Sequence, residues 1–235
     1  MNQILCLDFD GVIFDSQKEC LLVSYLTYKK IQSKDLVKYS LNEIPKEIFE
    51  TFYKYRYLVR PAWQYLVLIE MIYKNKKINS KTFKLSCNNN LKNKSLIESS
   101  FFNLRSKLMN ESIDTWISLN PPYPEVVDVW NNIKLFDEVY LVTNKNYQPV
   151  IKLLKFYNLN IAEKNIFSQE KIKRKINTLT MLKDRHNLEY SQTYFVDDSS
   201  YYVSQALDAA SIPIWLGGDM KKTIYLEINC QEKRF

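Results

Sequence analysis

The stretch Ile4–Ser16, which reads ILCLDFDGVIFDS, decides the fold of this 235-residue chain. An apolar run, typical of a buried strand, ends in two carboxylates separated by one residue and followed by a glycine. Side chains two positions apart on an extended strand point the same way, so Asp8 and Asp10 share one side, about 6–7 Å apart along the strand. Two such carboxylates repel each other unless a cation or a proton lies nearby. The stretch therefore indicates a charged site at the end of a buried strand.

Glycine is rare in this chain, and its placement adds to the interpretation. Of the three glycines, Gly217 and Gly218 lie near the far end, and Gly11 directly follows Asp10. A glycine at this position indicates that the backbone needs conformational freedom there. The alternative is that the two aspartates only cap the strand and form a turn, which is the better interpretation of an isolated D-x-D-G.

Three later segments decide against that alternative. The segment Val139–Lys145 reads as a strand that ends in Thr143, and Lys175 opens a helix. The segment Thr193–Ser199 reads as a strand that ends in Asp197 and Asp198. Together with Ile4–Ser16, these segments resemble, in order and spacing, the four signatures of the haloacid dehalogenase-like (HAD) superfamily of phosphatases and phosphotransferases.

The remainder of the chain reads as strands that alternate with helices, after one helical stretch. Parallel pairing with right-handed crossovers is expected when a helix separates consecutive strands. Strands are expected at 3–9, 138–143, about 165–167, 193–197 and 212–216. Helices are expected between them at 124–134, 147–157, 176–186 and 200–210. The predicted fold is α/β, a Rossmann-like parallel sheet sandwiched by helices.

The helical stretch interrupts this series directly after the first strand. Residues 17–118 show no alternation of period two and read as several helices, at about 17–28, 46–57, 62–73 and 95–117, with a loop and a short helix at 74–94. Prolines at 121, 122 and 124 mark its end. We expect residues 1–16 and 119–235 to form the HAD-like core. By resemblance, 17–118 form an inserted α-helical cap.

The resemblance implies roles for the two aspartates of the first signature. Asp8 is the expected nucleophile, which forms an aspartyl-phosphate and divides one difficult displacement into two steps. Asp10 is the expected general acid and base, and its backbone carbonyl helps to hold the metal. Members of the family that cleave carbon–halogen bonds lack an acid at the position of Asp10, so a dehalogenase is disfavoured.

The resemblance also implies a phosphate-binding set and a metal-binding set. Mg²⁺ is the expected cofactor, because it binds carboxylates, waters and substrate phosphate together. Lys171 and Lys173 remain alternatives to Lys175, and whether Asp197 is a direct ligand is left open. The expected phosphate ligands are Gly11, Thr143, Asn144 and Lys175, and the expected metal ligands are Asp8, Asp10, Asp197 and Asp198.

Composition limits the cellular context. The chain has 33 Lys and Arg against 26 Asp and Glu, a net charge of +7, and a solvated Lys-rich surface explains this better than nucleic-acid binding. Its four cysteines form no C-x-x-C pair, which favours a reduced, cytoplasmic protein. We expect no signal peptide, since the chain runs directly into its first strand, and no membrane span, since no apolar run approaches about 20 residues.

The sequence thus predicts a Mg²⁺-dependent phosphatase that hydrolyses a small phosphorylated metabolite. A sugar-phosphate mutase or phosphotransferase of the same fold is the alternative, and a non-catalytic HAD-like binding protein is a weaker one. The expected partner is the phosphorylated substrate, with no nucleic acid and no membrane, and the protein is expected to be a monomer or homodimer. Arg56 and Arg60 are the candidates for anion recognition in the cap.

Overall fold

A computed structural model describes residues 3–32, 40–130, 133, 136–208 and 211–215. The chain divides into two compact units. One unit comprises Met1–Asp15 and Pro121–Phe235, and the other comprises Ser16–Asn120. The first is an α/β unit and the second is helical. The chain therefore leaves the α/β unit once, after its first strand, and returns to it before the second.

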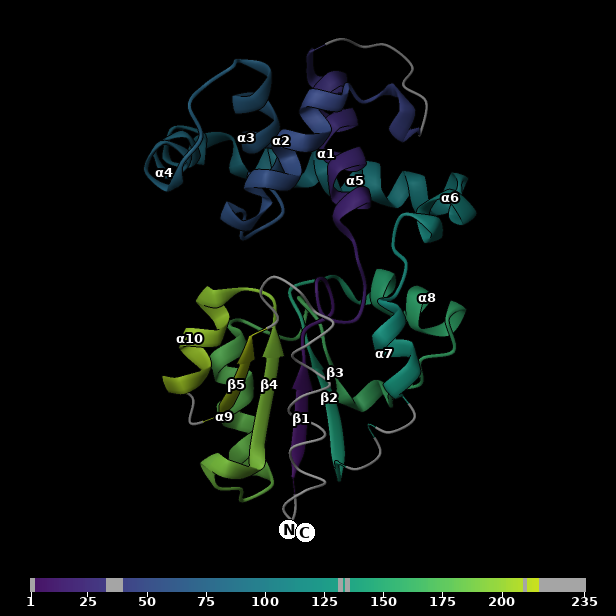
Figure 1. Ribbon diagram of the computed structural model, residues 1–235, viewed down its shortest axis with the longest axis vertical. Helices are drawn as coiled ribbons and strands as arrows, with labels where there is room; N and C mark the ends of the chain where they lie inside the picture. Colours follow the sequence, from purple (N-terminus) through teal and green to yellow (C-terminus); the bar gives the residue numbers. More distant parts are fainter. Residues whose placement is uncertain (1–2, 33–39, 131–132, 134–135, 209–210, 216–235) are drawn as a thin grey trace. The chain divides into compact units, whose positions relative to one another are not determined.

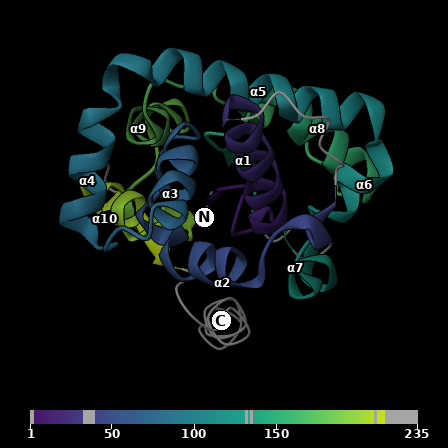
Figure 2. The same cartoon turned by 90° about the horizontal axis from the view of Figure 1, so that it is seen from above.

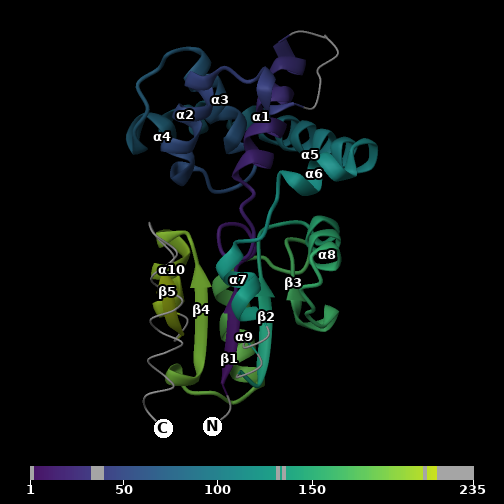
Figure 3. The same cartoon turned by 45° about the vertical axis from the view of Figure 1, so that its right-hand side comes forward.

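The α/β unit is built on a five-stranded parallel sheet with the order β3-β2-β1-β4-β5 (Figures 1 and 3). The strands are β1 (Ile4–Leu7), β2 (Glu138–Val142), β3 (Ile166–Phe167), β4 (Thr193–Asp197) and β5 (Ile212–Trp215). The first strand is central, and β1 and β4 are buried along their whole length. Continuous burial is typical of parallel strands that are covered on both faces. The predicted fold class is confirmed.

Helices connect these strands and cover the sheet. They are α7 (Pro124–Val129), α8 (Tyr147–Phe156), α9 (Lys175–Arg185) and α10 (Ser200–Asp208), with short 3₁₀ turns at Glu163–Asn165 and Tyr190–Gln192. Alternate residues of three strands pack against α9 and α10 in one core cluster. Its members are Ile4, Cys6, Tyr140, Val142, Leu179, Leu182, Leu188, Phe195 and Ala206.

The register of the sheet places the end of β1 beside acidic residues. Leu7 pairs with Val196 on β4 and with Leu141 on β2. The amide of Asp8 then donates to the carbonyl oxygen of Val196 at 2.9 Å. Asp8 is thereby level with Asp197, at the carboxyl edge of the sheet where ligands bind in open α/β folds.

The helical unit is packed around its first helix. In Figure 2, α1 (Gln17–Gln32) lies against α3 (Gln64–Tyr73) and α5 (Lys94–Glu111). Both α2 (Lys46–Tyr55) and α4 (Ser80–Asn89) pack on α3. The remaining elements are α6 (Ile113–Ser118) and 3₁₀ turns at Leu41–Glu43, Arg56–Leu58 and Leu91–Asn93.

The single helix expected at 95–117 is two helices, which separate at Ser112. The backbone of Ser112 leaves the helical region, with φ −148° and ψ 58°. Its amide donates to the carbonyl oxygen of Leu108 and closes α5, whereas its carbonyl oxygen accepts from the amide of Trp116 and opens α6. The apolar periodicity continues across this break, which is why the sequence pattern does not mark it.

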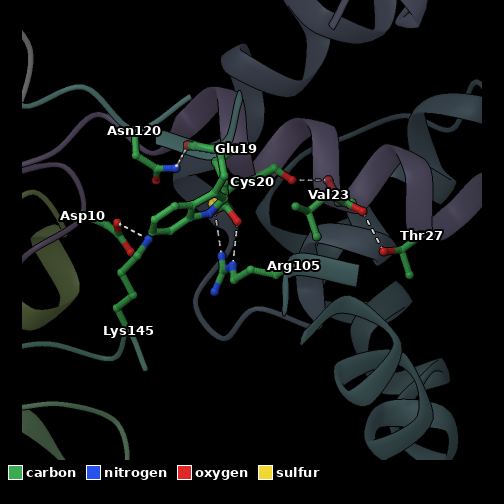
Figure 4. A network of polar contacts seen from close by, with 10 residues as sticks. Asp10, Glu19, Cys20, Val23, Thr27, Arg105, Asn120 and Lys145 are labelled. Atoms are coloured by element: carbon green, nitrogen blue, oxygen red, sulfur yellow. Dashed lines mark hydrogen bonds and ion pairs between the residues drawn. The ribbon is translucent and has the colours of Figure 1, made fainter. Parts of the chain in front are cut away.

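A buried ion pair joins α1 to α5 inside the helical unit (Figure 4). Arg105 Nε lies 2.6 Å from Glu19 Oε1, and Arg105 Nη2 lies 2.9 Å from Glu19 Oε2. Both side chains are buried, and the guanidinium lies 4.7 Å from the ring centre of Phe101. A two-pronged contact of this kind satisfies both charges where water is absent.

Asparagine takes the left-handed position at the ends of three helices. Asn75, Asn158 and Asn187 have φ values of 46°, 55° and 52°, and they follow α3, α8 and α9. Glycine is the usual residue at this position, and asparagine is the common substitute. In this glycine-poor chain, these three helices of the described residues end on asparagine instead of glycine.

The two segments that connect the units lie side by side within the α/β unit. The amide of Asp15 donates to the carbonyl oxygen of Pro121 at 2.9 Å, and the amide of Tyr123 donates to that of Ile13 at 3.0 Å. Phe14 also forms an antiparallel bridge with Pro122. The outgoing and returning chain therefore form a short paired ribbon.

Two further expectations concern cysteines and membrane spans. Cys6, Cys20 and Cys87 are buried free thiols, whereas Cys230, like Gly217 and Gly218, lies outside the described residues. Within the described ranges, no helix combines the length and the apolar character that crossing a bilayer requires.

Candidate functional site

Asp8 is the first polar residue after β1, and it is buried. Its Oδ2 atom lies 2.8 Å from Nζ of Lys175. Its Oδ1 atom is also buried but has no hydrogen-bond partner among the residues that the structure describes. A buried carboxylate oxygen without a partner is costly, so this atom is a candidate contact for a bound group.

Lys175, the first residue of α9, is the lysine that reaches this carboxylate. Its buried Nζ lies 2.8 Å from Asp8 Oδ2 and 2.7 Å from Asp197 Oδ2. Lys171 and Lys173 are exposed, and Lys171 donates to the carbonyl oxygen of Ile166. Of the three lysines that the sequence left open, the structure brings only Lys175 to Asp8.

The acidic pair follows β4 and contributes two more carboxylates. Asp197 accepts from Lys175 through Oδ2 and from the amide of Ser199 through Oδ1, at 2.8 Å. Asp8, Asp197 and Asp198 each offer an oxygen, and these atoms all lie within 4.8 Å of one another. The carboxylate of Asp10 is not part of this cluster, and the expectation that its backbone carbonyl helps to hold the metal stays a prediction.

The cluster fits a divalent cation. One lysine cannot neutralise three carboxylates, and Asp8 presents an oxygen that no donor satisfies among the described residues. Carboxylate oxygens are the ligands that Mg²⁺ prefers. Both oxygens of Asp197 accept hydrogen bonds, one of them from Lys175, so Asp197 can orient the lysine. Asp8 offers the cation the oxygen that no described donor satisfies.

The charged groups of the cluster shift one another's pKa values. Burial raises the pKa of Asp8 to about 7, with Lys175 acting against it and the carboxylates of Asp197 and Asp198 acting with it. Burial alone would lower the pKa of Lys175, but Asp197 and Asp8 outweigh it and the pKa lies above its usual value. The lysine is therefore charged at neutral pH, whereas Asp8 without a cation is close to its titration midpoint.

Gly11 supplies space for Asp198. Its φ is +82°, and a Cβ atom built on it would lie 2.2 Å from Oδ2 of Asp198. Its amide donates to the carbonyl oxygen of Phe14, which closes the loop after Asp10. The prediction that Gly11 contacts phosphate stays a prediction, and what the geometry gives this residue is close packing against a carboxylate.

Thr143 and Asn144 follow β2 at the same edge of the sheet. Thr143 is buried, and its Oγ1 accepts from the amide of Lys145 at 3.1 Å, so its own hydroxyl hydrogen can be donated. Asn144 is exposed, and its side-chain amide donates to the hydroxyl of Tyr202 at 2.8 Å.

Two residues of the site were not selected from the sequence. Lys145 Nζ forms an ion pair with Asp10 Oδ1 at 2.8 Å. Tyr202, on α10, holds Asn144 and places its ring 4.6 Å from Nζ of Lys175. The available signals were a lysine directly after the strand-ending Thr-Asn, and a tyrosine on the first turn of the helix after the acidic pair.

Comparison with known proteins identifies the fold. No protein-family model and no curated protein matches the sequence. Solved structures do match, among them a predicted phosphoglycolate phosphatase from Haemophilus somnus, at 15% identity and a TM-score of 0.57, over 89% of this chain and 83% of that one. Other matched structures are described as haloacid dehalogenase-like hydrolases, so the fold is HAD-like. This confirms, at the level of fold, the resemblance seen in the sequence.

Two other solved structures are similar over the same share of this chain. A haloacid dehalogenase-like hydrolase from Streptococcus pneumoniae is 13% identical, with a TM-score of 0.53, over 89% of this chain and 82% of that one. A candidate β-phosphoglucomutase from Thermotoga maritima is 14% identical, with a TM-score of 0.51 and the same coverage. Identities this low establish the HAD-like fold, and the activity has to be argued from the site.

Proposed function

We propose that this protein is a Mg²⁺-dependent phosphatase, which hydrolyses a small phosphorylated metabolite through an aspartyl-phosphate on Asp8. The observation that carries the proposal is the buried carboxylate of Asp8, which touches Lys175 and leaves one oxygen without a partner among the described residues, at the carboxyl edge of a HAD-like sheet. The names of the structural neighbours, a phosphoglycolate phosphatase and a β-phosphoglucomutase, support phosphoryl transfer.

Asp8 and Asp198 would hold the cation, and Asp197 would orient Lys175. When bound, Mg²⁺ supplies the positive charge that lets an anionic phosphate approach a group of carboxylates. Lys175 adds a second positive charge beside the nucleophile, and the hydroxyl of Thr143 can donate to a phosphate oxygen. Phosphate esters are among the slowest bonds to hydrolyse unaided, so this concentration of donors is needed.

The chain's own residues can carry both halves of the reaction. In the first, a carboxylate oxygen of Asp8 forms a bond to phosphorus while the bond to the leaving oxygen breaks, and Asp10 gives its proton to that oxygen. In the second, the Asp10 carboxylate takes a proton from water, which attacks phosphorus and releases Asp8. Because Asp10 supplies this acid, carbon–halogen cleavage is the weaker assignment.

The test is a screen of phosphorylated metabolites with and without Mg²⁺, measuring inorganic phosphate. Asp8→Asn should abolish release while preserving the fold, because the amide is nearly the same size but a poor nucleophile. Asp184→Asn is the matched control, because this exposed aspartate lies on α9 of the same unit. Substantial turnover by folded Asp8→Asn would refute the mechanism.

The screen also separates the alternative of a sugar-phosphate mutase. Such an enzyme would use the same residues but return the phosphoryl group to a sugar hydroxyl instead of to water. With hexose phosphates it would produce an isomer and little inorganic phosphate. Measuring both products with the same substrate therefore decides between the two activities.

A further inference from the structure

Each aspartate of the Asp8-Phe9-Asp10 motif has a lysine partner of its own. Lys175 contacts Asp8. Lys145 contacts Asp10 with an Nζ–Oδ1 distance of 2.8 Å, and Figure 4 shows this ion pair. The Lys145 side chain is 1% exposed, whereas that of Asp10 is 27% exposed. A substrate can therefore reach the carboxylate of Asp10 more easily than the ammonium of Lys145.

The position of Lys145 is fixed by its backbone. Its amide donates to Oγ1 of Thr143 at 3.1 Å, and its carbonyl oxygen accepts from the amide of Gln169 at 3.1 Å. Its ammonium lies 5.7 Å from the ring centre of Phe9, the residue between the two aspartates in the sequence. Because the Lys145 side chain is buried and its backbone amide and carbonyl are both hydrogen-bonded, the ammonium is held in one position.

The backbone that carries Asp10 is equally constrained. The amides of Ile13 and Phe14 both donate to the carbonyl oxygen of Phe9, and the amide of Gly11 donates to that of Phe14. The rings of Phe9 and Phe14 stack with centres 4.6 Å apart. With the loop closed in this way, the rotation that remains for Asp10 is that of its side chain, and Lys145 contacts the end of that side chain.

We propose that Lys145 is a positioning residue, which holds the carboxyl group of Asp10 so that the proton this group carries in the first half-reaction is aimed at the leaving oxygen. The inference rests on the proposed phosphatase function. The two lysines then have separate roles, because Lys175 contacts the nucleophile and Lys145 acts on the acid through an ion pair. Proton transfer by a positioned acid contributes about 10²- to 10⁴-fold to rate.

The dependence on leaving group tests this role. The substrates are phenyl, 4-nitrophenyl and 2,4-dinitrophenyl phosphate, which leave with increasing ease and carry no second anionic group. For Lys145→Met we expect kcat/KM to fall about 100-fold with phenyl phosphate, whose leaving oxygen needs a proton. It should change little with the dinitrophenyl ester, whose leaving group departs unprotonated. Lys155→Met, at an exposed position of α8, is the control.

A second substitution at Lys145 and a double-mutant cycle with Asp10 complete the test. Lys145→Gln keeps an N–H donor and should lose less activity toward phenyl phosphate than Lys145→Met. In an Asp10→Asn background, Lys145→Met should have no further effect, because the group it positions is gone. A uniform loss across the three esters would overturn the positioning role, as would failure of both Lys145 variants to fold.

The outcomes also separate this inference from the function on which it rests. If the folded wild-type protein with Mg²⁺ hydrolyses none of the three esters, the phosphatase proposal is refuted and the inference with it. If the wild-type protein hydrolyses them and Lys145→Met leaves their relative rates unchanged, the phosphatase stands and the role of Lys145 is refuted.

Discussion

Replacing Gly11 by alanine is expected to disturb the site through one contact whose size the structure gives. A Cβ atom at Gly11 would lie 2.2 Å from Oδ2 of Asp198, and ordinary contact begins at 3.4 Å, so the carboxylate must move by at least about 1.2 Å. The φ of +82° adds about 1–2 kcal/mol of backbone strain for a residue with a side chain. A misplacement of this size in a catalytic group can cost about 100-fold in rate.

The assay combines thermal unfolding with Mg²⁺-dependent phosphate release. Gly11→Ala should lower the midpoint of unfolding by several degrees and require more Mg²⁺ for half-maximal activity, because Asp198 is displaced. In an Asp198→Gly background, where all three of the atoms that the new Cβ would meet are absent, the same substitution should cost only the backbone strain, about 1–2 kcal/mol. Equal costs in the two backgrounds, or an unchanged Mg²⁺ requirement, would refute the argument that Gly11 exists to make room for Asp198.

Three further predictions concern stability, pH and substrate choice. Glu19→Gln should destabilise the protein by about 3–5 kcal/mol, since it leaves the Arg105 guanidinium buried without a counter-charge, and chemical denaturation measures this. Burial raises the pKa of Asp8 from 3.8 to about 7, so between these values the folded, metal-free protein holds a proton that the unfolded chain releases. The stability of the metal-free protein should therefore fall as pH rises toward 7. Added Mg²⁺ should raise the unfolding temperature more at pH 8 than at pH 5.5, because the ion binds the ionised carboxylate. An equal rise at the two pH values would count against Asp8 as a ligand. Arg56→Ala or Arg60→Ala should change which metabolites are hydrolysed but have less effect on 4-nitrophenyl phosphate, and an unchanged substrate profile would remove the arginines from recognition.

Local patterns were sufficient to predict the fold class and the elements that carry the site. The strand expected at 193–197 is Thr193–Asp197, and that at 138–143 is Glu138–Val142, because runs of buried apolar residues followed by polar ones mark the ends of parallel strands. The expectation that Asp8 and the acidic pair meet at one edge follows from parallel pairing alone. The geometry agrees, with oxygens of the three aspartates within 4.8 Å.

Contacts between distant residues were beyond the reach of such patterns. Lys145 pairs with Asp10 across 135 positions, and Arg105 pairs with Glu19 across 86. Which lysine reaches which carboxylate depends on the order of the strands and on side-chain rotamers, and neither leaves a periodic trace in the sequence. The same limit explains why Lys171 and Lys173 remained alternatives to Lys175.

The paired ribbon of the α/β unit, where the chain leaves for the helical unit and returns, has an evolutionary consequence. Asp15 and Pro121 are joined by a hydrogen bond of 2.9 Å, so the 105 intervening residues, Ser16–Asn120, begin and end at neighbouring points. Closing so small a gap would need only a short linker, and units whose ends meet are readily inserted or exchanged. The helical unit could thus be replaced by recombination without changing the register of the strands in the sheet. A lineage could exchange this module while Asp8 and its neighbours stay unchanged.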